Sequence, residues 1–196
     1  MSGRPGYPTG HEPRIDVRAA LHRFADVATV VGTQRPDAGG CWCMSYRDSR
    51  VPNPERPAYL RAECASEPGP GVLGYVDGVV AGWCSIAPRN SYRRLLHSRT
   101  IPIPDDRDTW VAVCFVVRAG YRGHGLTHRL LAGAVDHARA HGAEVVEGYP
   151  VAGRVDVISG YVGTVELFER AGFERAAPTT GRSGGRQRWV MRLVLS

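Results

Sequence analysis

Hydrophobic and polar positions in the first third of the chain predict two helices and a short strand. Apolar residues recur every three or four positions over 15–31, which is typical of an amphipathic helix. Residues 41–46 (CWCMSY) predict a short strand, because a Gly-Gly pair precedes them and a proline-rich segment follows. Residues 57–65 predict a helix, and the sequence Glu-Pro-Gly-Pro at 67–70 ends it.

The middle of the chain contains the clearest strand signals. Two apolar runs, 72–76 and 79–87, flank Asp77-Gly78, a pair typical of a tight β-hairpin turn. Asn90 is expected to cap a short helix that ends near His97, and a loop rich in Pro and Asp follows over 101–109. The continuous run 110–117 is rich in β-branched residues. It therefore predicts a strand that is buried on both faces, at the centre of a sheet.

A glycine-containing loop, a helix and a further strand follow this central strand. Gly120 to Gly125 interrupt the apolar run, and the next helical stripe starts at Leu126 and is closed by Gly142. Residues 144–151 predict the next strand, parallel to the central one across a right-handed crossover. Thr164 is expected to cap a helix over 165–171, and segments around Phe173 and at 189–195 predict closing strands.

Composition is compatible with one folded domain in a reducing compartment. The chain has 196 residues, of which 43% are hydrophobic, enough for one core. We expect a disordered tail over 1–14 and a single domain over 15–196. The longest apolar run has 8 residues, so no membrane span and no signal segment are expected and the protein is predicted to be cytoplasmic. Five cysteines are too few for a secreted disulfide framework, and we expect them to be reduced.

All 25 basic residues are arginine, since the sequence contains no lysine. This excludes P-loop NTPases and enzymes that need a Schiff-base lysine. Arginines gather at 89–99, 118–129 and 182–192 without a pattern of stacking aromatics, so nucleic acid is an unlikely partner. The sequence GRSGG at 181–185 matches a nucleophile-elbow pattern, but neither a helix nor a later His and acid follows it.

The loop 121–127 (YRGHGLT) is the most informative motif, because it connects the central strand to a helix. The first N–H groups of a helix have no partner within the helix, and the helix dipole is positive at that end. Glycines let a ligand approach the backbone closely. The loop therefore suits a phosphate group, although a plain tight turn has the same residues.

This loop, the following βαβ unit and a later ERAGF segment, in that order, resemble the GNAT acetyltransferase superfamily. The segments are VCFVVRAGYRGHGLTHRLLAGAVDHARAHG, EVVEGYPV and GTVELFERAGFER. The hairpin and the N-terminal elements also fit the layout, so the resemblance covers most of 15–196. CWCM and GWC segments are similar to those of a bacterial branch. The resemblance implies a mixed α/β fold of three layers, with a mainly antiparallel sheet, one central parallel βαβ pair and flanking helices.

The resemblance also implies a binding site for acetyl-CoA as acyl donor. Backbone groups of Phe115 and Val117 would bind the pantetheine arm. Amides of the loop would hold the pyrophosphate; these belong to Arg122, Gly123, His124, Gly125, Leu126 and Thr127. The central strand must then separate from the strand at 145–151 to leave room for the thioester and the acceptor.

Two positions depart from the family pattern. Where the family often has Gln or Arg, this chain has Gly120, so anion binding would rest on Arg118 or Arg122. Where the family commonly has the tyrosine that protonates the leaving thiolate, this chain has Phe168. Tyr161, two helical turns earlier, is a candidate acid, and a packed aromatic or protonation by water are the alternatives.

Glu147 is the candidate general base, acting through water on the acceptor amine. Its alternative role is a structural ion pair with an arginine, since a bare buried charge is costly. Tyr149 shares its strand face and is expected to line the pocket.

Cys41 and Cys43 form only one tight pair, so no metal is expected. Cys84 and Cys114 are expected in the core, with an acyl-cysteine route as the minority alternative.

The sequence thus predicts an acetyl-CoA-dependent N-acetyltransferase that transfers directly to a primary amine, and a small molecule is the expected acceptor. The alternatives are a CoA-binding regulatory module with little catalysis and a basic nucleic-acid binder. A homodimer is compatible with the sequence. The acceptor's identity does not follow from it.

Overall fold

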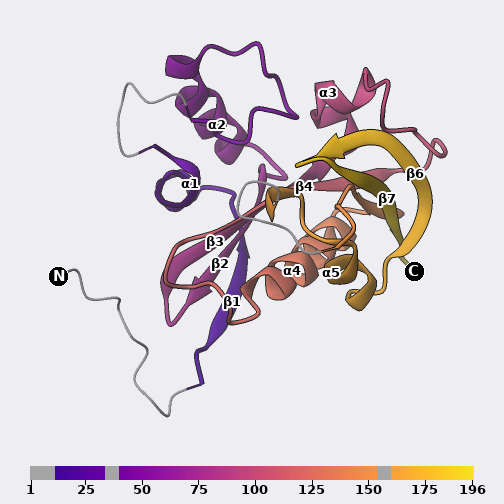
Figure 1. Cartoon of the computed structure of the whole chain (residues 1–196). Helices are drawn as coiled ribbons and strands as arrows, with labels where there is room; N and C mark the ends of the chain where they lie inside the picture. Colours follow the sequence, from indigo (N-terminus) through magenta and orange to yellow (C-terminus); the bar gives the residue numbers. More distant parts are fainter. Residues whose placement is uncertain (1–11, 34–39, 154–159) are drawn as a thin grey trace.

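A seven-stranded sheet organises the protein, whose computed structural model describes residues 12–33, 40–153 and 160–196 (Figure 1). The strand order is β1-β2-β3-β4-β5-β7-β6, and every neighbouring pair is antiparallel except β4 and β5. The strands are β1 (Ile15–Ala19), β2 (Gly71–Val76), β3 (Val79–Pro88), β4 (Thr109–Val117), β5 (Val145–Gly148), β6 (Glu174–Ser183) and β7 (Arg186–Val194).

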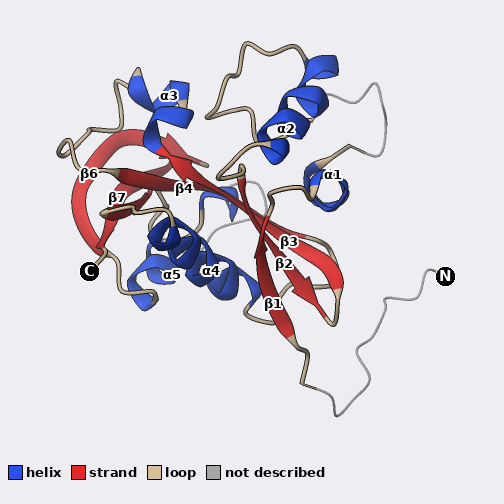
Figure 2. Cartoon of the chain, turned by 180° about the vertical axis from the view of Figure 1, so that it is seen from behind, coloured by secondary structure: helices blue, strands red, loops and turns tan. Residues whose placement is uncertain are grey.

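Helices cover both faces of this sheet, which gives three layers. Figures 1 and 2 show α1, α2 and α3 on one side and α4 and α5 on the other. The helices are α1 (Phe24–Val31), α2 (Arg56–Ala65), α3 (Arg93–Leu96), α4 (Leu126–Ala140) and α5 (Val165–Arg170), with 3-10 turns η1 (Asn53–Glu55), η2 (Arg89–Ser91) and η3 (Gly160–Val162). The expected mixed fold with one parallel pair is confirmed.

Small residues let α4 approach the sheet closely. Gly74 of β2 and Gly82 of β3 lie beneath α4, and a Cβ on Gly82 would lie 2.9 Å from a methyl carbon of Leu130. On Gly74 a Cβ would lie 2.8 Å from Leu126. The start of α4 is therefore held directly over the hairpin, and this fixes where the preceding loop emerges.

Most of the predicted central elements are confirmed. Asp77 and Gly78 turn the β2–β3 hairpin with φ values of 48° and 80°. The predicted central strand is β4, and the following helix is α4, with Gly142 at φ 80° just past its end. Thr164 caps α5 by accepting a hydrogen bond from the Leu167 N–H. The strand predicted at 144–151 is shorter, because regular pairing ends at Gly148.

The helix predicted over 15–31 is wrong in its first half. Residues Ile15–Ala19 form β1, an edge strand paired with β2, and only Phe24–Val31 is helical. Val17 faces α4, where it meets Gly133. The apolar positions of a strand and of the next helix happened to fall at helical spacing, and pairing with β2 decides between the two structures.

The strand predicted at 41–46 is also wrong, because this segment forms a series of turns. Trp42 and Cys43 have φ values of 46° and 56°, which lie in the left-handed region and do not occur in a strand. Asn90 does not cap a helix either. It lies within η2, and Tyr92 is the residue that precedes α3.

The parallel pairing of β4 and β5 is short, and this positions the candidate site. Thr109 to Ala112 pair with Val145 to Gly148, and β4 then continues for five residues with no strand of the described chain on that side. On its other side β4 stays paired with β3, where the register skips Val113 and forms a β-bulge. The two strands therefore separate beyond Ala112 and Gly148, as the sequence analysis expected.

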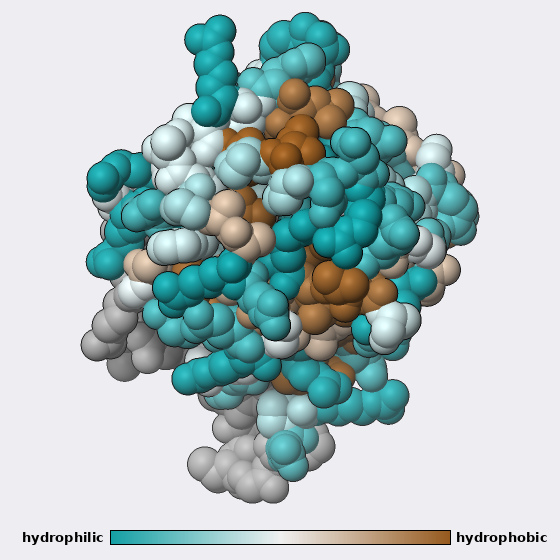
Figure 3. All heavy atoms as spheres, turned by 90° about the vertical axis from the view of Figure 1, so that its right-hand side faces the viewer, coloured by the Kyte–Doolittle hydropathy of each residue, from teal (hydrophilic) through white to brown (hydrophobic). Residues whose placement is uncertain are grey.

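The surface is largely polar on the side that carries β6 and β7. In Figure 3 apolar residues appear there as separate small patches within a hydrophilic face.

In the described part of the chain, no helix has both the length and the apolar character needed to cross a bilayer. The tail predicted over 1–14 lies almost wholly outside the described residues, which begin at 12.

Candidate functional site

Beyond Ala112, the edge of β4 that faces β5 has no strand partner among the described residues. We call it the free edge of β4, and it presents the backbone groups of Phe115 and Val117. The Arg118 N–H donates to the Ala81 carbonyl of β3 at 2.9 Å. Backbone groups of alternate residues point to opposite edges of a strand, so those of Phe115 and Val117 point away from β3. In agreement, the Val117 carbonyl accepts a hydrogen bond from Arg122 Nε at 3.2 Å. This edge can accept an extended ligand as an additional strand would be accepted.

Phe168 of α5 occupies the base of the space between β4 and β5. Its ring is fully buried and packs edge-on against Phe115, with ring centres 6.1 Å apart. It also lies so close to Gly148 that a Cβ there would collide with the ring. The phenyl group thus keeps the strands apart on the α4 side, and it has no proton to donate.

The loop that follows β4 leads directly into the N-terminus of α4. Gly123 and Gly125 have φ values of 84° and 74°, which glycine adopts at little cost. Gly125 is the N-cap of α4 and supplies no side chain to cap it, and the first turn contains no acidic residue. A Cβ on either glycine would meet no atom within 4 Å. The helix end therefore faces open space and can bind an anion.

The predicted loop residues lie together around this end. The exposed residues are Arg122, Gly123, His124 and Gly125. Leu126 is the first residue of α4, and its side chain is buried, so it presents only its backbone. Thr127, in the first turn, is partly exposed. Arg118 is committed elsewhere, since its Nη1 donates to the Val80 carbonyl at 2.6 Å. Arg122 is therefore the better placed of the two candidate arginines.

A cavity of about 390 Å³ lies against the opposite side of the same strand. The side chains of Phe115 and Val117 pack toward α4, whereas Cys114 and Val116 pack toward α1 and α2. The cavity is lined from β4, the end of α1, the 41–46 turns and η3, by Val30, Val31, Gly32, Cys41, Trp42, Cys43, Ser45, Tyr46, Val113, Cys114, Val116, Tyr161 and Val162. One strand thus carries the predicted arm site on its edge and a cavity on its face.

Tyr161 is placed at this cavity, next to the β4 residues that line it. It belongs to η3, which lies against β4, and 47% of the residue is exposed. Its environment is therefore open, unlike that of a packed core aromatic. This exposed position beside the cavity is compatible with the predicted acid.

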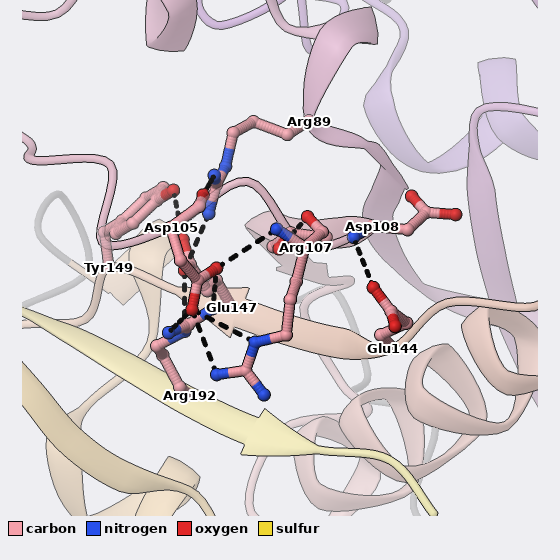
Figure 4. A network of polar contacts seen from close by, with 9 residues as sticks. Arg89, Asp105, Arg107, Asp108, Glu144, Glu147, Tyr149 and Arg192 are labelled. Carbon is pink, nitrogen blue, oxygen red and sulfur yellow. Dashed lines mark hydrogen bonds and ion pairs between the residues drawn. The ribbon is translucent and has the colours of Figure 1, made fainter.

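Glu147 lies outside the described lining of this cavity, in a buried network of charged side chains (Figure 4). The carboxylate is fully buried, and Oε1 lies 2.7 Å from Arg89 Nη2 and 2.9 Å from Arg192 Nε. Tyr149 donates a hydrogen bond to Oε2 at 2.9 Å. Arg192 also binds both oxygens of Asp105 at 2.8 Å. Of the two roles left open by the sequence, this geometry is that of the ion pair.

Tyr149 completes the network as a donor. Burial, followed by the neighbouring Glu147 carboxylate, raises the pKa of Tyr149 well above its usual value. The phenol is therefore protonated at neutral pH and keeps its hydrogen bond to the carboxylate. It does not belong to the described lining of the cavity, contrary to the expectation that it lines the pocket.

The sequence did not identify the arginine partners of Glu147. Arg192 reaches Asp105 across 87 residues of sequence, and Arg89 lies in a 3-10 turn after β3. An acidic residue within an apolar strand signals a charged partner, but only the sheet order shows which one. The role of Trp42 and Tyr46 in the cavity was likewise hidden, because their segment was expected to be a strand.

The cysteines were considered as metal ligands and as nucleophiles. Among the described residues, no group of three or more His, Cys, Asp or Glu side chains could hold a metal ion. The hydrogen bond with Cys43, followed by burial, raises the pKa of Cys114 well above its usual value. Burial raises the pKa of Cys84 in the same way. Both thiols are therefore protonated at neutral pH, and a thiol is a poor nucleophile. This disfavours the acyl-cysteine route at these two positions.

Comparison with known proteins agrees with this architecture. A model of the acetyltransferase (GNAT) family matches residues 40–173, more than half of the chain. No curated protein matches the sequence.

Solved structures with a similar fold have low sequence identity. The protein yncA of Salmonella typhimurium, assigned as an acetyltransferase and solved with acetyl-CoA, is 20% identical with a TM-score of 0.54, over 93% of this chain and 94% of that one. A ribosomal-protein-alanine N-acetyltransferase of Brucella melitensis is 20% identical with a TM-score of 0.56, over 91% and 99% of the two chains. At this identity the likeness supports the fold.

The ion pair predicts a structural effect of Glu147→Gln. A neutral amide would leave the buried Arg89 guanidinium without a countercharge, whereas Arg192 would keep its ion pair with Asp105. We expect a loss of about 3 kcal/mol in the free energy of unfolding. The measurement is urea unfolding followed by circular dichroism. As a control, Asp136→Asn removes an exposed ion pair with Arg139 and should leave the midpoint unchanged.

The same variant tests the other role of Glu147. Unchanged stability of Glu147→Gln, together with loss of the acidic limb of the pH–rate profile, would support the general base and contradict the structural role.

Proposed function

Because the chain belongs to the acetyltransferase (GNAT) family, we propose that it transfers an acetyl group from acetyl-CoA directly to a primary amine of a small molecule. The observation that carries the proposal is the continuity of two features along β4. Its free backbone edge ends at a glycine loop whose helix terminus has no cap. A long ligand with a polar amide arm and a diphosphate matches this pair of features.

The residues present fit such a ligand. Open space above Gly123 and Gly125 would admit a diphosphate to the amides of Arg122 to Thr127. The carbonyl and amide groups of Phe115 and Val117 would bind the pantetheine arm. Arg122 now donates to the Val117 carbonyl, so binding of the arm would release this side chain for the phosphates. The structure of yncA with acetyl-CoA supports this choice of ligand.

The chain's residues would act mainly by positioning and by donating hydrogen bonds. Acetyl-CoA supplies the activated thioester. A backbone N–H at the free edge near Val117 would donate to the oxygen that becomes negative when a neutral amine attacks. The cavity beyond Cys114 and Val116 would hold the body of that amine. Tyr161, at its boundary with β4, would donate a proton to the leaving thiolate.

The alternative of a CoA-binding module with little catalysis rests on a specific residue. Phe168 occupies the place of the family's usual acid, and its buried ring cannot donate a proton. If Tyr161 does not replace that acid, the same groove would bind CoA without efficient transfer. Release of free thiol from acetyl-CoA across a panel of amines separates the two functions.

Thr127→Glu is expected to weaken CoA binding while leaving the fold intact. A carboxylate in the first turn of α4 interacts favourably with the helix dipole, so the melting midpoint should stay the same or rise. The same charge repels a diphosphate at the helix terminus, and the Kd for CoA should rise at least about tenfold. Calorimetric titration measures this. Thr127→Gln is the control of equal size and should change the Kd much less; equal affinity of the Glu and Gln variants would remove the phosphate assignment.

Tyr161→Phe is expected to separate chemistry from binding. Loss of the phenol proton should lower kcat by about 100-fold, the usual scale for one acid or base group, with the Kd for CoA unchanged. Steady-state kinetics with acetyl-CoA and titration with CoA give the two values. An unchanged kcat would show that water or another group protonates the thiolate.

A further inference from the structure

We propose that the acceptor is a small primary amine whose remaining body is apolar and uncharged. The inference rests on the proposed function, because it takes the cavity beside β4 as the place of the acceptor. It goes further by assigning a class of acceptor from the chemistry of the cavity wall.

The described wall offers apolar contact and few polar groups. Five valines from α1, β4 and η3 line it, and the indole of Trp42 and the phenol of Tyr46 add aromatic surface. Ser45 and the thiols contribute only weak or neutral hydrogen-bonding groups. The described wall contains no arginine, histidine, aspartate or glutamate. An apolar body would thus replace water there at little cost.

A second ammonium group on the acceptor would find no carboxylate among these wall residues. Two guanidinium groups approach the ring of Tyr46, with Cζ atoms of Arg188 and Arg94 5.7 and 5.8 Å from its centre. Neither arginine belongs to the described wall, but both place positive charge behind it. A further cation would lose its hydration and be repelled, whereas an alkyl or aryl group would not.

A carboxylate on the acceptor would also remain unpaired. Arg188 Nε already donates to the Tyr149 carbonyl at 2.8 Å, and Arg94 Nη1 donates to the Ser45 carbonyl at 3.3 Å. Arg47 is buried in an ion pair with Glu63. None of these three arginines lines the cavity, so none is placed to pair with a carboxylate inside it. Amino acids should therefore be poorer acceptors than the corresponding amines without a carboxylate.

The size of the cavity limits the acceptor as well. A volume of about 390 Å³ lies near the lower end of the range for small-molecule sites. It suits an amine with a single ring or a short alkyl chain.

Two pairs of amines test the class directly. Hexylamine and 1,5-diaminopentane have the same length and differ in a terminal methyl against an ammonium group. Phenethylamine and phenylalanine differ in a carboxylate. Turnover with acetyl-CoA should give a kcat/KM at least tenfold higher for hexylamine and for phenethylamine than for the charged member of each pair. Equal or reversed preference in both pairs would overturn the inference.

Variants of the wall should reverse the first preference. Val116→Glu places a carboxylate at the cavity, so this variant should favour 1,5-diaminopentane over hexylamine. Val116→Gln introduces a neutral side chain of the same size as Glu and should keep the original order. Val30→Glu and Val30→Gln repeat the comparison from α1, in case the β4 substitution prevents folding. If the Glu variants fold, bind CoA and keep the original order, the cavity does not hold the acceptor body.

A parallel titration with CoA separates this inference from the proposed function. Absence of CoA binding would contradict the proposed function itself. If CoA binds but none of the four amines is acetylated, the acceptor class alone is overturned. The same holds if CoA binds and the only acetylated acceptor is a peptide that begins with alanine.

Discussion

The candidate site depends on the separation of two parallel strands at the centre of the sheet. β4 and β5 pair over four residues and then part at Ala112 and Gly148. Two features maintain this separation: a bulge at Val113 changes the course of β4, and the buried ring of Phe168 fills the space next to Gly148. If the strands stayed paired, the hydrogen-bonding groups of Phe115 and Val117 would be satisfied within the sheet and would not be available to a ligand.

Because of this separation, one strand can serve two ligands. The free edge of β4 leads to the helix terminus that suits a diphosphate, and its face toward α1 carries Cys114 and Val116 into the cavity. Because successive residues of a strand point in opposite directions, the groups at the edge and those at the cavity point different ways although they are only one or two residues apart in sequence. The acetyl donor on the edge of β4 and the acceptor amine in the cavity on its face would then meet at this part of the strand. Ion pairs of Arg192 with Glu147 and Asp105 connect β7 to β5 and to the 101–109 loop.

The sequence was sufficient for the centre of the fold and insufficient for its periphery. The hairpin at Asp77-Gly78, the buried run of β4 and the capped helix after Thr164 are encoded by local signals, and the structure has them at the expected positions. Residues 15–19 form a strand only because β2 offers an edge, and that information is distant in sequence. The cavity wall was unpredictable for a similar reason, since it depends on left-handed conformations at Trp42 and Cys43 that propensity does not favour. For Glu147 the sequence defined two roles, and the position of Arg89 and Arg192 shows the ion pair.

A crystal structure of the protein with CoA tests the central claim most directly. The account predicts the diphosphate on the amides of Arg122 to Thr127, the pantetheine arm hydrogen-bonded to Phe115 and Val117, and its sulfur in the space between β4 and β5. CoA bound elsewhere on the surface, with the Val117 carbonyl still paired to Arg122 and no ligand between the strands, would contradict it.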